Sequence, residues 1–216
     1  MPKRLKKELI KLTAKDRLHQ LAVPVIGLTG GIATGKSTAS KILQSFNLSI
    51  ICADQLVKKV YQTEQTRNYL EENLPSVING QKIDFAKLRL IAFNHPQTLQ
   101  KLEDAIYPQM GRQFRLEYQA INTPPLIIYD VPLLFEKGLT PLFDLTICIY
   151  TTYQQQLERL MERDSISKQQ AEQMLARQDR IEKKCQLADY AIDNGRDPAE
   201  LRPQLEELFS QITEDC

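Results

Sequence analysis

The stretch "VIGLTGGIATGKSTASKIL", residues 25–43, passes from an apolar run through a glycine-rich turn into a run with helical spacing. It contains the pattern of a glycine, four residues, and then Gly-Lys-Ser or Gly-Lys-Thr, carried here by Gly30, Gly35, Lys36 and Ser37. The apolar run before the glycines reads as a short buried strand, and the spacing after them predicts a helix. A glycine-rich turn that binds nothing would need neither flank, so the stretch predicts a phosphate-binding loop.

Each residue type in this loop has a physical role. Gly30, Gly31 and Gly35 permit backbone angles that a Cβ atom disfavours, so that successive N–H groups can turn inward around a phosphate at a helix N-terminus. Lys36 supplies a positive charge to the β- and γ-phosphates, and the Ser37 hydroxyl is a ligand for Mg²⁺. The expected ligand is therefore a nucleoside triphosphate.

Apolar runs elsewhere predict the rest of the fold. Several are apolar on both alternating faces, which is typical of parallel strands that are covered on both sides. The strand-like runs are residues 25–29, 48–53, 126–130, 145–150 and 188–192. Helical segments separate most of them, which indicates a doubly wound α/β sheet whose ligands bind beyond the carboxyl ends of the strands.

Two helical segments are not needed for such a sheet. Residues 55–123 are too long for one crossover and predict a helical insertion. Residues 153–184 alternate in charge and have two interpretations, a solvated helical hairpin or a lid that closes over the triphosphate. The lid would bring one of four arginines to the phosphates: Arg159, Arg163, Arg177 or Arg180.

Two carboxylates follow predicted strands at the edge where the ligand should bind. Asp54 is either a helix N-cap or the base that accepts a proton from an acceptor hydroxyl, and it can be both. Asp130 either holds Mg²⁺, directly or through water, or is a strand-end charge stabilised by Lys36.

Composition excludes several classes of function. Hydrophobic residues make up 42% and charged residues 25% of the 216 residues, as in an ordinary globular protein. No apolar run is long enough to cross a membrane, and the net charge of +1 gives no reason to expect nucleic-acid binding. The four cysteines lack metal-ligand spacing and are expected to be reduced thiols in the cytoplasm.

Residues 1–23 form a basic N-terminal extension. Seven Lys or Arg against two acidic residues give residues 1–20 a charge of +5. Leu5, Leu9 and Leu12 have helical spacing, so the expected structure is a solvated extension helix. An organelle transit peptide is disfavoured because serine is absent and acids are present.

Taken together, the motifs resemble those of the dephospho-coenzyme A kinase family. The resemblance extends from about Pro24 almost to the end of the chain. It is carried by "GLTGGIATGKST", "ADQLV", "DVPLLFE", "QLERLMERD" and "ADYAIDNGRD" in this order. Many kinases share the first motif, whereas "DVPLLFE" and "ADYAIDN" are much more specific. The family phosphorylates the ribose 3′-hydroxyl of dephospho-coenzyme A with ATP, in the final step of coenzyme A biosynthesis.

The resemblance also implies roles for individual residues. Asp54 would be the general base, and Arg159 or Arg163 would reach the ATP phosphates. Asn194 would lie near the adenine, and Tyr107 stands in the acceptor site where the family usually has histidine. The ATP phosphates would bind at Gly30, Gly31, Ala33, Thr34, Gly35, Lys36, Ser37 and Thr38, and the acceptor pocket would be lined by Pro132, Leu133 and Leu134.

The same resemblance implies a nucleotide-kinase fold with a five-stranded parallel core, a helical acceptor-binding domain and a lid. The core would comprise residues 24–54, 124–152 and 185–216, the acceptor-binding domain residues 55–123 and the lid residues 153–184. A cytoplasmic monomer or weak homo-oligomer that binds neither nucleic acid nor membrane is expected.

Three other functions compete with this one. A nucleoside monophosphate kinase or another small-molecule kinase would share the loop but leave "DVPLLFE" unexplained. A GTP-regulated switch would need an Asn-Lys-x-Asp sequence, which the chain lacks. A nucleotide sensor without turnover would bind ATP in the same loop, and only an assay of ATP consumption would separate it from a kinase.

Overall fold

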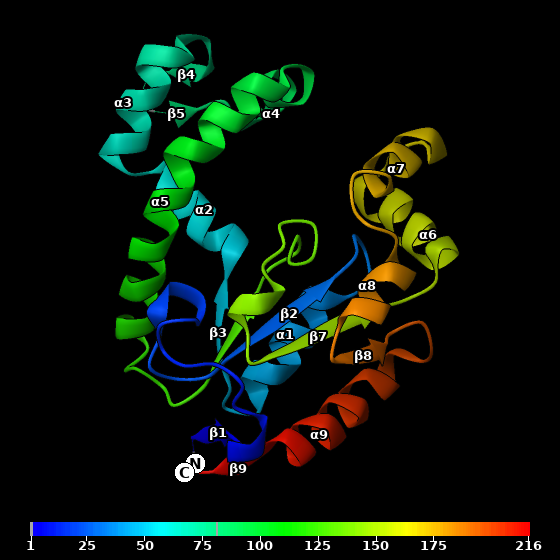
Figure 1. The fold of residues 1–216 in the computed structure, drawn as a ribbon. Coiled ribbons are helices and arrows are strands. Elements are labelled where there is room, and N and C mark those ends of the chain that lie inside the picture. The colour runs from blue at the N-terminus through cyan, green and yellow to red at the C-terminus, as the bar shows by residue number, and fades with distance from the viewer. Residues whose placement is uncertain (1, 81) are drawn as a thin grey trace. The chain divides into compact units, whose positions relative to one another are not determined.

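The computed structural model describes residues 2–80 and 82–216, and the chain divides into two compact units (Figure 1). Unit 1 comprises Met1–Ala53 and Ile121–Cys216, and unit 2 comprises Asp54–Ala120. Within the described residues, no helix is both long and apolar enough to span a bilayer.

A five-stranded parallel sheet forms the centre of unit 1. Its strand order is β3-β6-β2-β7-β8, and every neighbouring pair is parallel. The strands are β2 (Val25–Gly30), β3 (Ser49–Cys52), β6 (Ile127–Asp130), β7 (Leu145–Tyr150) and β8 (Tyr190–Asp193). All five predicted strands are present, so the predicted fold class is confirmed. Because β2 is central, the loop that follows it lies between the ends of β6 and β7.

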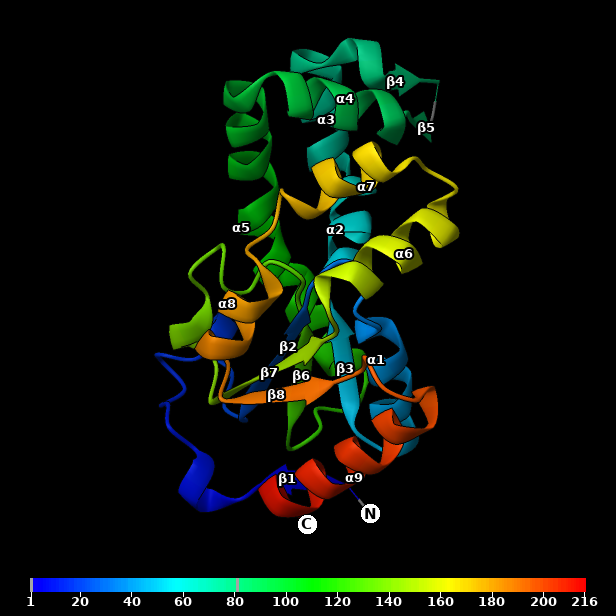
Figure 2. The ribbon, with the colours of Figure 1, turned by 90° about the vertical axis from the view of Figure 1, so that its right-hand side faces the viewer.

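Helices cover both faces of this sheet (Figure 2). On one face, α1 (Lys36–Ser45) and α9 (Leu201–Ile212) pack on the strands, and Leu43 and Leu205 belong to the same fully buried cluster as Ile147. On the other face lies α8 (Ile181–Leu187), which contacts β7. The alternation of side chains along a strand explains why both faces of β7 are apolar.

The polar segment before α8 is a helical hairpin. It consists of α6 (Tyr153–Asp164) and α7 (Lys168–Leu175), and each helix begins with a capping box, at Thr152 and at Ser167. The Ser or Thr side chain accepts from a backbone N–H while a glutamine side chain returns to the cap, which satisfies the free ends of the helix. The predicted helical character of residues 153–184 is therefore confirmed.

The N-terminal extension is not a helix, so that prediction is wrong. Its first element is β1 (Lys3–Leu5), which pairs antiparallel with β9 (Thr213–Asp215). Two single 3-10 turns follow, Lys7–Leu9 and Leu18–Gln20. Leu5 is fully buried in the cluster beneath α9 and Leu9 packs against that cluster, so two of the three leucines that suggested a helical stripe are used in the core of unit 1.

A buried ion pair attaches the extension to the sheet. The Arg17 guanidinium donates to both carboxylate oxygens of Asp144, at 2.7 and 3.1 Å, and both side chains are almost completely buried. Asp144 also accepts from the backbone N–H groups of Lys11, Leu12 and Val25. Because Val25 is the first residue of β2, this carboxylate joins the extension to the start of the central strand.

Unit 2 is helical, as predicted for residues 55–123. Its helices are α2 (Ala53–Tyr61, from the last residue of unit 1), α3 (Glu64–Asn73), α4 (Phe85–Asn94) and α5 (Pro96–Ala120). A 3-10 turn at Pro75–Val77 precedes a short hairpin of β4 (Ile78–Asn79) and β5 (Lys82–Ile83), which the helical periodicity did not indicate. Leu70, Val77 and Phe114 are fully buried and form part of its core.

Candidate active site

The phosphate-binding loop joins β2 to α1, as predicted. Gly35, the residue before α1, has a φ of +89°, which favours glycine. A Cβ atom at this position would also lie 2.0 Å from Nδ2 of Asn194, so any other residue would be strained and would displace the Asn194 amide. The unpaired N–H groups at the start of α1 make this helix end an anion site.

Lys36 and Asp130 are brought together at the centre of the sheet edge. The Lys36 ammonium pairs with Oδ1 of Asp130, and the Ser40 hydroxyl donates to Oδ2 at 2.8 Å. Both charged side chains are nearly buried, with 12% and 6% exposed. The predicted stabilisation of Asp130 by Lys36 is therefore observed, while magnesium binding by Asp130 stays a prediction.

The oxygen donors near the loop fit a magnesium ion that is held mainly by a nucleotide. Such an ion takes one or two protein oxygens and completes its shell with phosphate oxygens and water. Ser37 is exposed in the first turn of α1, and Asp130 offers a carboxylate close by in the same site. Among the residues that the structure describes, no group of three or more His, Cys, Asp or Glu side chains could hold a metal alone. Ser37 and Asp130 therefore suit a magnesium ion that enters the site bound to the nucleotide.

Two glutamine side chains of the lid hold the phosphate-binding loop by the backbone of Ile32, one at its carbonyl and one at its N–H. Gln156 of α6 donates to the Ile32 carbonyl at 2.6 Å, and the Gln178 side-chain oxygen accepts from the Ile32 N–H at 3.1 Å. Ile32 and Ala33 also pack against a small buried cluster of α6 and α7 centred on Leu160. The loop conformation thus depends on the lid.

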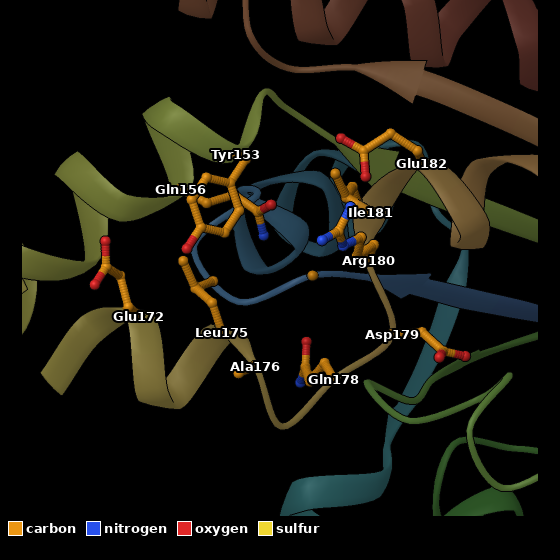
Figure 3. A pocket seen from close by; sticks show the side chains of 11 residues that line it. Tyr153, Gln156, Glu172, Leu175, Ala176, Gln178, Asp179, Arg180, Ile181 and Glu182 are labelled. Atoms are coloured by element: carbon orange, nitrogen blue, oxygen red, sulfur yellow. The ribbon is translucent and has the colours of Figure 1, made fainter. Parts of the chain in front are cut away.

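A cavity of about 510 Å³ opens beside this contact, between the lid helices and the loop (Figure 3). Gly31 of the loop lines it together with Tyr153 of α6 and Arg180, the residue before α8. Tyr153 is 47% exposed at the cavity. A space of this size beside the loop suits the phosphates of a nucleotide.

The lid arginines differ in their surroundings. Arg180 is exposed and lines the cavity. Arg159 donates from Nη2 to the Asn194 carbonyl at 3.0 Å, and Arg163 pairs with Asp164 on the surface. In this conformation Arg180 therefore has direct access to the cavity beside Gly31.

Asn194 follows β8 and contacts the loop directly. Its Nδ2 donates to the Thr34 carbonyl at 2.8 Å. Together with the Arg159 contact to its own carbonyl, this makes Asn194 a support of the phosphate-binding loop. Its predicted position near the adenine stays a prediction.

Three acceptor residues predicted in unit 1 lie in the turn that follows β6. Pro132 and Leu133 are partly exposed. Leu134 is fully buried, and a Cβ atom at Gly27 of β2 would lie 2.5 Å from its Cδ1. Leu134 therefore anchors the turn to the sheet in this conformation, whereas the other two present surface to a ligand.

Unit 2 contains the remaining two predicted residues. Asp54 is exposed as the second residue of α2, so it lies inside the first turn rather than at the cap position. Tyr107 of α5 is 47% exposed. Burial raises the pKa of Tyr61 to about 12, and neighbouring Tyr107 and Glu103 add to this, so Tyr61 stays neutral at physiological pH.

Sequence reasoning missed the residues that hold the site together. Gln156, Gln178 and Glu136 carry no chemical signal of their own in the sequence. Lys184 could have been found, because it lies three residues after the buried Ile181, on what should be the apolar face of α8. A lysine in such a stripe is unusual, since charged groups are almost never fully buried unless they are paired.

The fold and site define a phosphate-loop kinase of the nucleotide-kinase type, with a central phosphate-binding strand, a helical insertion after the next strand and a helical lid. The comparisons identify the family. Residues 24–200 match the family model for dephospho-CoA kinase. The chain belongs to the dephospho-CoA kinase family.

Individual relatives agree with this assignment. The chain is 34% identical over 199 residues to a dephospho-CoA kinase of Fusobacterium nucleatum, covering 91% of this chain and 98% of that one. It is 36% identical over 192 residues to one of Staphylococcus haemolyticus, covering 86% and 94%. The solved dephospho-CoA kinase of Campylobacter jejuni superposes with a TM-score of 0.63 at 27% identity, covering 87% and 96%. The predicted family and enzyme class are therefore confirmed.

Proposed function

We propose that this chain transfers the γ-phosphoryl group of ATP to the ribose 3′-hydroxyl of dephospho-coenzyme A, giving coenzyme A and ADP. The observation that carries the proposal is a complete phosphate-binding loop, with its lysine in place and a lid cavity beside it, in a chain that matches this family over residues 24–200. Kinase chemistry needs such a loop for the donor.

The donor phosphates bind at the loop and at the start of α1. Residues 30–38, among them Ala33, Thr34 and Thr38, surround the β-phosphate, mainly with backbone N–H groups. Lys36 leaves Asp130 and moves to the γ-phosphate, because a phosphate carries more charge than a carboxylate. Ser37 and the released Asp130 would hold Mg²⁺, which would supply positive charge to the nucleotide phosphates.

Asp54 accepts the proton of the acceptor hydroxyl. The 3′-oxygen forms a bond to the γ-phosphorus while the bond from that phosphorus to the β–γ bridging oxygen breaks, and ADP leaves. An exposed carboxylate in the first turn of a helix suits this role, because it is accessible to a substrate. The position of Asp54 inside the helix also leaves its side chain without a capping duty.

Acceptor-binding residues are assigned in each unit separately. In unit 1, Pro132 and Leu133 in the turn after β6 offer the acceptor an apolar surface, and Leu134 holds that turn on the sheet. In unit 2, the acceptor-binding residue is Tyr107 of α5. Residues 55–123 serve as the acceptor-binding domain and residues 153–184 as the lid, with residues 24–54, 124–152 and 185–216 as the nucleotide core.

At least one lid arginine contacts the transferred phosphate. Arg180 is best placed in the present conformation because it lines the cavity beside Gly31. Arg159 and Arg163, the two arginines predicted from sequence, would have to leave Asn194 and Asp164 on closure. Asn194 supports the loop near the nucleotide. The enzyme acts in the cytoplasm as a monomer or weak homo-oligomer, without nucleic acid or membrane.

The proposal is tested by ATP consumption with and without dephospho-coenzyme A. ADP should form only when the acceptor is present, and mass spectrometry should find one added phosphate on the ribose 3′-oxygen. ADP formation that requires a nucleoside monophosphate instead would identify a different small-molecule kinase. ATP binding without turnover on any acceptor would identify a nucleotide sensor.

A further inference from the structure

Lys184 is a fully buried charge behind the phosphate-binding loop. Its side chain is 0% exposed, and its ammonium lies 2.8 Å from Oε1 of Glu136. Burying such a pair costs desolvation energy that its attraction only roughly balances, and apolar residues of similar volume often stabilise a core as well or better. Stability alone therefore gives little reason for a lysine here.

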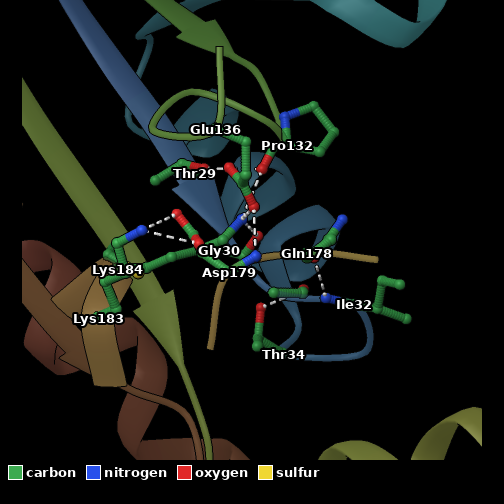
Figure 4. Close-up of polar contacts among 12 residues, drawn as sticks. Thr29, Gly30, Ile32, Thr34, Pro132, Glu136, Gln178, Asp179, Lys183 and Lys184 are labelled. Carbon is green, nitrogen blue, oxygen red and sulfur yellow. Dashed lines mark hydrogen bonds and ion pairs between the residues drawn. The ribbon is translucent and has the colours of Figure 1, made fainter. Parts of the chain in front are cut away.

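The other contacts of Lys184 lie in two segments that surround the site (Figure 4). Its ammonium donates to the Pro132 carbonyl at 2.9 Å and makes a longer contact of 3.4 Å with the Gly30 carbonyl. Gly30 is the last residue of β2, where the phosphate-binding loop begins, and Pro132 lies in the turn after β6. Thr29 also donates to the Pro132 carbonyl, at 3.2 Å.

Glu136 extends this contact to the lid. Its Oε1 also accepts from the backbone N–H of Asp179 at 3.0 Å. The neighbouring Gln178 accepts from the Ile32 N–H of the loop, so residues 178 and 179 are fixed at two points. Among the described residues, Oε2 of Glu136 is the one buried side-chain oxygen or nitrogen without a partner, so the pair is not arranged for maximal stability.

We propose that Lys184 is a positioning residue for phosphoryl transfer, which fixes the loop entrance, the turn after β6 and the lid at residues 178–180 in one arrangement. Lys184 acts through backbone carbonyls and Glu136, without touching the substrates. Its removal should leave ATP binding nearly intact, because the N–H groups at the start of α1 are unchanged. It should misalign the lid and the acceptor turn, to which the transfer step is sensitive. The inference rests on the proposed function.

The test compares Lys184→Met with the double variant Lys184→Met and Glu136→Gln. The single variant leaves a buried carboxylate unpaired and should melt at a much lower temperature. In the double variant both charges are gone, while the glutamine oxygen can still accept from Asp179, so the melting temperature should recover. If Lys184 positions the site, kcat of the double variant stays about 10- to 100-fold low while KM for ATP changes by less than about threefold.

Lys183→Met is the matched control. Lys183 is the next residue on α8, is 58% exposed and pairs with Asp179 at the surface, so its loss should leave kcat unchanged. Should the double variant not fold, Lys184→Arg keeps a charge beside Glu136. Its larger planar group has to displace the two carbonyls, so kcat should fall at least tenfold.

Wild-type kcat in the double variant, or in Lys184→Arg, would overturn the inference and leave Lys184 as a structural ion pair. Absence of acceptor-dependent ADP formation by the wild-type enzyme would instead overturn the proposed function. The two failures are therefore distinguishable, because the first requires an active wild-type enzyme as its reference.

Discussion

The ammonium of Lys36, the first residue of α1, pairs with the carboxylate of Asp130, the last residue of β6, and is proposed to leave it for the γ-phosphate when the donor binds. The pair explains how a lysine that must serve a phosphate can be kept nearly buried beforehand. Ser40 holds the second carboxylate oxygen, so Asp130 remains oriented after Lys36 moves away.

Lys36→Ala should lower kcat by about 10³-fold or more, because it removes a charge that the transition state needs. It also leaves Asp130 buried with only Ser40 as partner, so some loss of thermal stability is expected. Adding Asp130→Asn should restore the melting temperature without restoring kcat. Steady-state kinetics measures kcat of the two variants, and circular dichroism measures their melting temperatures. A Lys36→Ala enzyme with more than about a tenth of wild-type kcat would contradict the assignment of Lys36 to the γ-phosphate.

Asp54→Asn should lower kcat by about 10²- to 10⁴-fold, since an amide cannot accept the hydroxyl proton. Its melting temperature should barely change, because Asp54 is exposed and is not a helix cap. Asp84→Asn is the control: Asp84 is the cap of α4, accepting from the Lys87 N–H at 2.9 Å, and asparagine caps about as well. Equal kcat in the two variants would show that Asp54 is not the base.

Among the lid arginines, Arg180→Ala should cause the largest loss of kcat, about 10²-fold or more, because Arg180 already lines the cavity. Parallel alanine variants of Arg159, Arg163 and Arg177 give the ranking, and Lys168→Ala on exposed α7 serves as the control for a lost surface charge. If Arg159 or Arg163 ranks first, the lid has to rearrange on closure more than the present conformation implies.

The N-terminal extension should be necessary for stability. Arg17→Met leaves the fully buried Asp144 unpaired and should lower the free energy of unfolding by about 3–5 kcal/mol. Arg4→Met removes an exposed pair with Glu214 and should cost about 0–1 kcal/mol. Urea denaturation of both variants measures the difference. Equal free energies of unfolding in Arg17→Met and Arg4→Met would mean that the extension is dispensable for stability, as the interpretation as a solvated helix implies.

The sheet and the phosphate-binding loop were predictable because their signals are local. Strands apolar on both faces and a glycine pattern before a helix each reflect a physical requirement within a few residues. The pairing of Lys36 with Asp130 was also predictable, since neighbouring parallel strands bring their carboxyl ends together.

The N-terminal extension and the support of the loop were not predictable in this way. Leucines at helical spacing also fit a strand and turns that pack one leucine at a time. Partners more than a hundred residues away decide between them: β9 for the strand, and Asp144 for Arg17. The contacts of Gln156 and Gln178 with Ile32 are equally distant in sequence. Tertiary contacts of this kind leave no periodic pattern.

Tyr153 gives a direct way to follow the lid by fluorescence. It lies at the start of α6, lines the cavity and is 47% exposed. The chain contains no tryptophan, so Tyr153→Trp would place a single indole there with no emission from another indole. The emission wavelength of an indole depends on its exposure to water. In a stopped-flow experiment, nucleotide binding and lid closure would therefore appear as separate phases in the wavelength and intensity of the indole emission, each with its own rate.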